Sequence, residues 1–405
     1  MRPKSAAVAL AMLCLIHVPQ ARAGIVAAPG AHLQVALITY GPGAIYWERF
    51  GHDALEVRDS ASGEAVNFNY GVFDFDARGF LLNFARGYMH YMIDAEPSAV
   101  DERFYMASGR SVVRQRLALS AAEAARLRDF LLWNLRPENA GYNYDYLRDN
   151  CTTRVRDALN MALGGALETQ LAARAGTMTY RQQIGRLMRA QPWLMLLLDL
   201  GLGPYADQPL NAWHESFLPM VLQDQLRVVR IADAHGALRP LVARERLIAP
   251  NRLAATPATA PDLRAPLALA GLGFAALIVW TRRRWSTAYA VLATIYLLNA
   301  AVAGTILLGL WTLTLHRVAW ANANLLLFNP FAFAFLRAVW RARRGRPVSR
   351  CARVLVVLQL FAALIAVLLH LLPGTVQQNE PWLLFAIPIW SALAWSWYRI
   401  AEVGR

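Results

Sequence analysis

The chain has 405 residues, of which 57% are hydrophobic, and it carries a formal net charge of +14. This apolar fraction is too high for an ordinary soluble protein, so the composition predicts membrane-spanning segments. The positive charge does not indicate nucleic-acid binding. Most of it comes from arginines that flank apolar segments near the C-terminus, whereas residues 24–263 are close to neutral. We therefore expect a lipid bilayer and no nucleic acid among its partners.

The N-terminus predicts a cleavable secretory signal over residues 1–23. Arg2 and Lys4 precede an apolar run from 6 to 18, and Ala21-Arg22-Ala23 offers a cleavage site before Gly24. The remainder is therefore expected to begin outside the cytoplasm.

The segment after the signal has the alternation of a β-sheet. Residues 33–40 predict a strand, and residues 51–58 and 65–71 predict a hairpin around a turn at 59–63. If Arg58 lies opposite Ala65, alternation places Asn69 on the same face as His52 and near it. A slip of one residue would place Tyr70 there instead.

Further elements are expected in the same region. They are strand and loop over 80–92, a short helix over 98–106, a strand over 112–119, and a helix from a capping box at 120–123 to about residue 135. Together they predict an α+β domain over residues 24–165, which is large enough for its own core. Residues 166–264 are expected to form a mostly helical extension and linker.

Cys151 is predicted to lie in the first turn of a helix. Asp149 and Asn150 are good N-cap residues, and apolar side chains of helical period follow at 155, 158, 159 and 162. Unpaired N–H groups and the helix dipole favour a thiolate in this place, which indicates a nucleophile. The alternative is a buried, inert cysteine.

The other cysteines favour the nucleophile. Cys14 lies in the signal and Cys351 lies at the cytoplasmic mouth of a predicted span, so Cys151 has no intramolecular disulfide partner. A nucleophilic cysteine needs a base, and the base needs an orienting group; His52 and Asn69 are the candidates. No histidine or cysteine spacing indicates a metal site, and no glycine-rich phosphate loop occurs, so we expect neither metal nor cofactor. Arg154 is expected to pair with Asp157.

The C-terminal part predicts five membrane spans. They cover approximately residues 265–281, 286–315, 321–340, 354–372 and 381–398. Arginine-rich loops alternate with nearly uncharged ones, which places residues 24–264 outside the cytoplasm and the C-terminus inside it. Pro330 should kink the third span. Asn322, Asn324 and Asn329 should face the bundle interior, where they either line an acyl or glycerol pocket or join helices by hydrogen bonds.

Several motifs together resemble the Lnb-type lipoprotein transacylase family. They are Gly51-His52-Asp53-Ala54, Asn69-Tyr70-Gly71-Val72-Phe73-Asp74, Asp149-Asn150-Cys151-Thr152-Thr153-Arg154, Ala206-Asp207, Phe217-Leu218-Pro219, Asn322-Ala323-Asn324 and Asn329-Pro330. The resemblance implies a circularly permuted papain-like domain, similar to NlpC and lecithin:retinol acyltransferase, followed by a five-helix transmembrane bundle. It also implies transfer of an acyl chain from a lipoprotein's diacylglyceryl group to its N-terminal amine.

Carried over residue by residue, the resemblance makes Cys151 the nucleophile and His52 the base. The orienting role of Asn69 rests on the predicted hairpin instead. Substrate contacts are expected from residues within or beside the motifs, namely Tyr70, Asn150, Thr152, Asn322 and Asn324. Membrane lipoproteins or phospholipid would be the substrate, and the sequence does not define an oligomeric state.

Two other classes of protein remain open. A cell-wall amidase or cysteine peptidase would use the same cysteine and histidine, but five spans are unusual for one. A non-catalytic membrane scaffold that binds lipoproteins would not need both His52 and Cys151.

Overall fold

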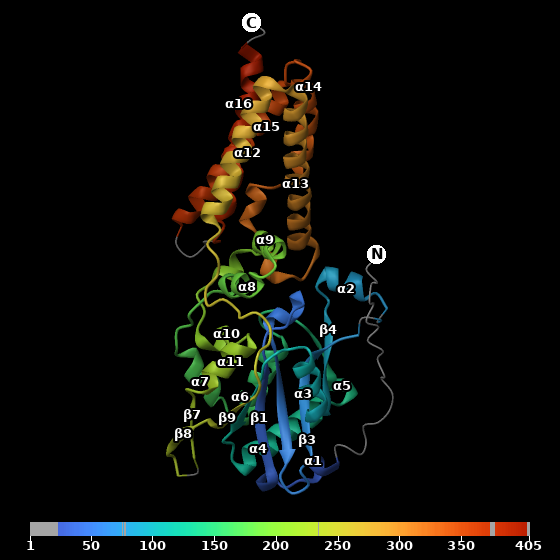
Figure 1. Ribbon diagram of the computed structural model, residues 1–405, viewed down its shortest axis with the longest axis vertical. Helices are drawn as coiled ribbons and strands as arrows, with labels where there is room; N and C mark the ends of the chain where they lie inside the picture. The colour runs from blue at the N-terminus through green and yellow to red at the C-terminus, as the bar shows by residue number, and fades with distance from the viewer. Residues whose placement is uncertain (1–22, 75, 77, 234, 373–376, 403–405) are drawn as a thin grey trace.

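The computed structural model describes residues 23–402 except 75, 77, 234 and 373–376. All of the predicted signal except Ala23 therefore lies outside the described residues. The molecule is elongated, with a sheet-containing domain at one end and long helices at the other (Figure 1).

The N-terminal part is built around a seven-stranded antiparallel sheet of order β6-β4-β3-β2-β1-β5-β9. Its strands are β1 (Leu33–Tyr40), β2 (His52–Asp59), β3 (Ala65–Val72), β4 (His90–Pro97), β5 (Val112–Leu117), β6 (Gly141–Asn143) and β9 (Val242–Ala249). A separate ribbon pairs β7 (Arg230–Ala232) with β8 (Leu238–Pro240). The predicted hairpin register is confirmed, since Arg58 pairs with Ala65 and Ala54 with Asn69.

Helices cover both faces of the sheet. The helices of this part are α1 (Ala23–Ala27), α2 (Phe80–Arg86), α3 (Ser98–Ala107), α4 (Ala121–Asn134), α5 (Pro137–Ala140), α6 (Cys151–Ala162), α7 (Ala166–Ala172), α8 (Tyr180–Met188), α9 (Pro192–Gly201), α10 (Ala212–Glu215) and α11 (Pro219–Leu226). Along β1, Leu37 packs in the core that contains α4 and α6, whereas Ile38 packs with Tyr105 of α3. Side chains of β1 alternate between the two faces of the sheet, so successive residues of the strand pack into two different cores.

Two sequence predictions are wrong here. Residues 80–86 form helix α2 instead of strand or loop, between glycines with left-handed backbone at both ends. The boundary at residue 165 is also wrong, because β9 completes the sheet and side chains such as Trp213 and Leu222 fill the same core as α4 and α6. The mostly helical character of the extension is confirmed for α7 to α11.

Four segments of the described residues are long and apolar enough to cross a membrane. They are α12 (Arg264–Arg284), α13 (Ser286–Leu313), a segment over Ala323–Arg343, and α15 with its short continuation (Arg350–Leu371). The third consists of η5 (Ala323–Leu326), η6 (Pro330–Phe335) and α14 (Leu336–Arg343), so Pro330 begins a 3-10 turn and the helix is broken rather than only kinked. The fifth predicted span forms α16 (Glu380–Glu402), which is not among the four.

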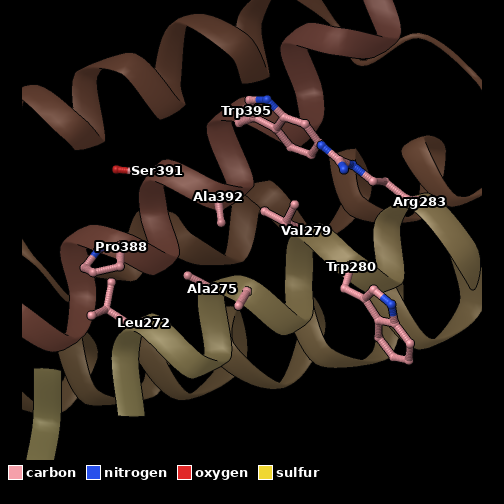
Figure 2. Close-up of a pocket in the computed structure, with 10 residues that line it drawn as sticks. Leu272, Ala275, Val279, Trp280, Arg283, Pro388, Ser391, Ala392 and Trp395 are labelled. Atoms are coloured by element: carbon pink, nitrogen blue, oxygen red, sulfur yellow. The ribbon is translucent and has the colours of Figure 1, made fainter. Parts of the chain in front are cut away.

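A groove of about 590 Å³ runs between α12 and α16. Figure 2 shows Leu272 and Ala275 of α12 facing Pro388 and Ala392 of α16, with Arg283 beside Trp395. The guanidinium carbon of Arg283 lies 5.2 Å from the Trp395 ring centroid. Figure 1 places this end of α12 at the far end of the bundle from the sheet. The groove is therefore separate from Cys151.

The predicted pocket asparagines join the two halves of the molecule. Asn322 and Asn324 are buried, and both donate to the carbonyl of Leu200 in α9, at 2.9 and 3.0 Å. Gln377 donates to the side chain of Asn322, and Asn379 donates to that of Asn324. We therefore correct their assignment as substrate contacts, because their hydrogen-bonding groups already hold the extension to the bundle.

Candidate functional site

Cys151 begins α6, as the sequence predicts. Asn150 is the N-cap and accepts a hydrogen bond from the N–H of Thr153 at 2.9 Å, while the Thr153 hydroxyl accepts from the N–H of Asn150. This reciprocal capping box fixes the chain direction at the helix start. The Asn150 amide also donates to the carbonyls of Tyr146 and Phe217. Asn150 is thus a buried positioning residue, which corrects its predicted role as a substrate contact.

The thiol of Cys151 lies against the start of β2. Backbone N–H groups of Asp53 and Thr152 donate to the sulfur, and the Thr152 hydroxyl lies 3.8 Å from it. The side chain of Thr152 is fully buried, so it supports the sulfur from within the protein, and its role as a substrate contact stays a prediction. Since Asp53 directly follows His52, this contact brings the cysteine to the strand end that carries the histidine.

His52 is held by an amide and a carboxylate in series. Its Nε2 lies 3.0 Å from Oδ1 of Asn69, and Nδ2 of Asn69 donates to Asp101 at 2.6 Å. Because the carboxylate can only accept from the amide nitrogen, the amide oxygen must face the imidazole and accept from Nε2–H. The series therefore leaves Nδ1 as the ring nitrogen that can take a proton.

Burial keeps both groups neutral at rest. Burial raises the pKa of the Cys151 thiol to about 11, with a further contribution from the Asp53 carboxylate. Burial also lowers the pKa of His52 to about 4, and the nearby Arg110 guanidinium adds to this effect. Both pKa directions favour a neutral pair at rest over the predicted thiolate, because the loss of hydration opposes the effect of the helix start and its N–H groups.

Three residues of the site were not predicted from the sequence. Asp101 lies on α3 and orients Asn69, Tyr105 stacks with His52 at 5.9 Å between ring centroids, and Arg110 lies over the Tyr105 ring at 4.6 Å. Their positions in the sequence do not indicate a role in the site, because α3 and the segment after it reach His52 only by packing on the sheet.

Tyr70 and Arg154 also differ from expectation. Tyr70 is buried in the core, where its hydroxyl donates to Asn134 at 2.7 Å, so we correct its assignment as a substrate contact. Arg154 pairs with Asp149 at 2.7 Å instead of Asp157, and it lies over the ring of Tyr142.

Asn69 gives a testable prediction. Asn69→Ala should lower turnover by about tenfold to a hundredfold, because the imidazole loses the group that sets its tautomer and orientation. Asn69→Asp should not restore the rate, since a carboxylate there would face Asp101 and repel it. Turnover and KM, measured for both variants together with thermal midpoints, check this; equal rates for Asn69→Ala and the native protein would contradict it.

Asp53 gives a prediction for pH. The carboxyl group of Asp53 is fully buried. Burial raises its pKa to about 7, from a usual value near 4. Between these two values the folded protein binds more protons at Asp53 than the unfolded chain does. The contribution of Asp53 to stability therefore falls as pH rises through this window.

Asp53→Asn should remove this dependence. The thermal midpoint of Asp53→Asn minus that of the native protein should increase as pH rises from about 4 to 7, and then level off. Differential scanning fluorimetry in detergent across this range is the measurement. A difference that shrinks with rising pH would show that Asp53 is ionised in the fold.

The fold and the site define a multi-pass membrane protein with an α+β domain in which a cysteine lies against the strand that begins with a histidine. Residues 22–185 match the family model of the Lnb N-terminal periplasmic domain, and residues 259–396 match that of the Lnb transmembrane domain. The two matches cover most of the chain, which belongs to the Lnb family. This membership makes it, in broad terms, a lipoprotein-modifying membrane enzyme. No curated protein and no solved structure matches the chain.

Proposed function

We propose that this protein is a cysteine acyltransferase that moves one acyl chain of a lipoprotein's diacylglyceryl group to the amine of the lipoprotein's N-terminal cysteine. The observation that carries the proposal is the series Asp101–Asn69–His52 beside Cys151, in a chain of the Lnb family. The periplasmic domain would have the permuted papain-like arrangement, with histidine on a strand and cysteine at a helix start.

The first half-reaction forms a thioester. Nδ1 of His52 takes the thiol proton as the sulfur of Cys151 attacks the ester carbonyl, and backbone N–H groups at the start of α6 hold the oxyanion. The bond between the carbonyl carbon and the glycerol oxygen then breaks. His52 returns the proton to that oxygen, and a lyso-glyceryl group leaves.

The second half-reaction forms an amide. The free amine attacks the thioester, His52 takes a proton from the nitrogen, and the carbon–sulfur bond breaks to release the thiolate, which His52 reprotonates. A neutral His52 at rest suits both half-reactions, because the imidazole must be unprotonated at the start of each to accept a proton. Water in place of the amine would yield a fatty acid, so exclusion of water decides between transfer and hydrolysis.

The experiment is expression with a reporter lipoprotein in a host that lacks its own N-acylating enzyme. Tandem mass spectrometry of the N-terminal lipopeptide should give fragments with one acyl chain on the amine and one on the glycerol, at an unchanged intact mass. An unchanged diacyl form, with Cys151 still labelled by an active-site-directed thiol probe, would favour a cysteine amidase. No change and no labelling would favour the scaffold.

We also infer five membrane crossings with a cytoplasmic C-terminus. In Figure 1 the long segments alternate in direction and α16 runs beside α12, its strongest packing partner. Arginines 282–284 at the end of α12 support a cytoplasmic location for this end. A C-terminal fluorescent protein should therefore fluoresce, whereas a C-terminal alkaline phosphatase should be inactive; the reverse pattern would overturn the inference.

A further inference from the structure

Exposed apolar side chains lie where the sheet-containing domain meets the membrane-spanning part. They lie on η2 (Tyr46–Phe50) with the residue before it, on α2 and on α9. We call this set the rim, and its members are Ile45, Tyr46, Trp47, Leu81, Leu82, Phe84, Trp193 and Leu197. The side chains of Leu81 and Trp193 are 79% and 66% exposed, which is costly if water covers them.

The end of α13 sets the height of α2 relative to the bilayer. Exposed apolar side chains continue along α13 through Trp311 to Leu313 and then Leu315, so contact with lipid continues to this level. The N–H of Leu315 donates to the carbonyl of Arg86 at 2.8 Å, and the ring of His316 bonds the carbonyl of Phe84 at 3.1 Å. Helix α2 is therefore fixed at the membrane surface.

The other two parts of the rim are tied to the same level. Leu196 and Leu200 of α9 pack against the core of the bundle. The η2 turn is held to this region because Arg49 donates to the carbonyl of Leu187 and Gln191 donates to that of Ala44. All three elements thus lie beside the membrane-spanning part.

The cysteine site is connected to the rim by aromatic rings. A side-chain carbon at Gly71 would lie 3.3 Å from Cβ of Cys151 and 3.9 Å from the ring of Tyr144. Tyr144 contacts Tyr146 edge to face at 6.0 Å, and Tyr146 stacks on His316 at 5.9 Å. Ring contacts therefore link the surroundings of the thiol to the segment that follows α13.

We propose that the rim inserts into the outer leaflet of the membrane and seats the mouth of the site on the lipid surface. Short elements with leucine, phenylalanine and tryptophan on one side are typical of interfacial insertion. Arg78 and Arg86, both exposed at the two ends of α2, suit the phosphates of lipid headgroups. This docking deepens the proposed function, since an acyl donor then reaches Cys151 without crossing water.

The test uses fluorescence and needs no activity, so it is independent of the proposed reaction. A variant without its native cysteines receives Leu82→Cys, is labelled with an NBD fluorophore, and is placed in nanodiscs of phosphatidylethanolamine and phosphatidylglycerol. The control label is at Ala61→Cys, in the exposed turn of the β2–β3 hairpin.

Spin-labelled lipid should quench the label at position 82 and leave the label at 61 unaffected, while aqueous iodide should do the opposite. Iodide quenching at both positions would overturn the proposal. Protection of position 82 from both quenchers would also overturn it, because a protein partner or a second copy would then cover the rim.

A separate observation concerns Tyr142 on β6. Its side chain is only 8% exposed, and within the described part of the chain its hydroxyl has no hydrogen-bond partner. A buried hydroxyl without a partner costs about 1–3 kcal/mol, so its retention requires a reason. This hydroxyl and Cβ of Cys151 both lie within 4 Å of the position that a side-chain carbon of Gly71 would take, so the hydroxyl lies near the nucleophile.

Gly71 leaves space between the two groups. A side-chain carbon at this position would lie 3.3 Å from Cβ of Cys151 and 3.9 Å from the hydroxyl of Tyr142. The backbone of Gly71 has φ of 91°, a conformation that glycine adopts without strain. The missing side chain thus lets Cys151 and the hydroxyl of Tyr142 approach the same point of the backbone.

We infer that the Tyr142 hydroxyl donates to the oxygen of the acyl carbonyl during attack by Cys151. This assignment rests on the proposed thioester chemistry. Tyr142→Phe keeps the ring and removes only the donor, and it should slow acylation of Cys151 by a p-nitrophenyl ester about a hundredfold. Alkylation of Cys151 by iodoacetamide forms no oxyanion, so its rate should not change.

Equal slowing of both reactions would overturn the assignment, because it would show a general disturbance of the thiol. An unchanged acylation rate would overturn it as well. If the native protein is acylated by the ester but makes no N-acyl lipoprotein, the proposed function fails while the role of Tyr142 is still measured.

Discussion

Replacing Cys151 with alanine should abolish formation of the N-acyl lipoprotein, with a loss of at least about a thousandfold. The thioester requires a nucleophile at this position, and Cys351, the other free cysteine of the described residues, lies in the first turn of α15. The fold should survive. The thiol is only partly buried, and the capping box that begins α6 belongs to Asn150 and Thr153.

The matched control is Cys351→Ala. Cys351 is exposed in the first turn of α15, so its replacement should leave product formation and thermal stability unchanged. The fragmentation spectrum of the reporter lipopeptide, taken for native protein and both variants at equal membrane levels, is the measurement, because the transfer leaves the intact mass unchanged. Fragments with an N-linked acyl chain in Cys151→Ala would exclude a thioester on this residue.

The part of the site that could be predicted from the sequence is the part that depends on local patterns, namely the β2–β3 hairpin and the start of α6. The alternation of β2 and β3 predicts the hairpin, and of the two registers left open, the one with Arg58 opposite Ala65 brings Asn69 to the face of His52, as the structure shows. Asn150 likewise marks the start of α6, because capping depends on residues only three positions apart. These features rest on contacts between near neighbours in sequence.

The remaining part depends on packing between distant segments. Asp101 reaches Asn69 across a separation of 32 residues, and no period or spacing relates the two. The protonation states also depend on burial, which a helix-start argument does not contain. The same holds for Asn324, since a polar residue in an apolar segment is compatible with both a pocket and the junction that the structure reveals.

Replacement of His52 should have the second large effect. His52→Ala should slow acylation of Cys151 by a p-nitrophenyl ester by about a hundredfold to ten-thousandfold, since the thiol, with a pKa raised to about 11, is almost entirely protonated at neutral pH without a base to deprotonate it. The native rate should stay nearly constant from about pH 5 upward and fall below about pH 4, where the imidazole becomes protonated. The variant should lose this acid limb.

The pH dependence of alkylation distinguishes a neutral thiol–imidazole pair at Cys151 and His52 from a preformed thiolate–imidazolium pair. Iodoacetamide reacts with thiolate, so with a neutral pair the native alkylation rate should keep rising with pH beyond 9. A preformed thiolate–imidazolium pair would instead give a rate that is flat from mildly acidic pH upward, and His52→Ala would then abolish the flat region. The pH dependence of alkylation, measured for the native protein and His52→Ala with Cys351 replaced in both, therefore decides whether His52 acts during attack or before it.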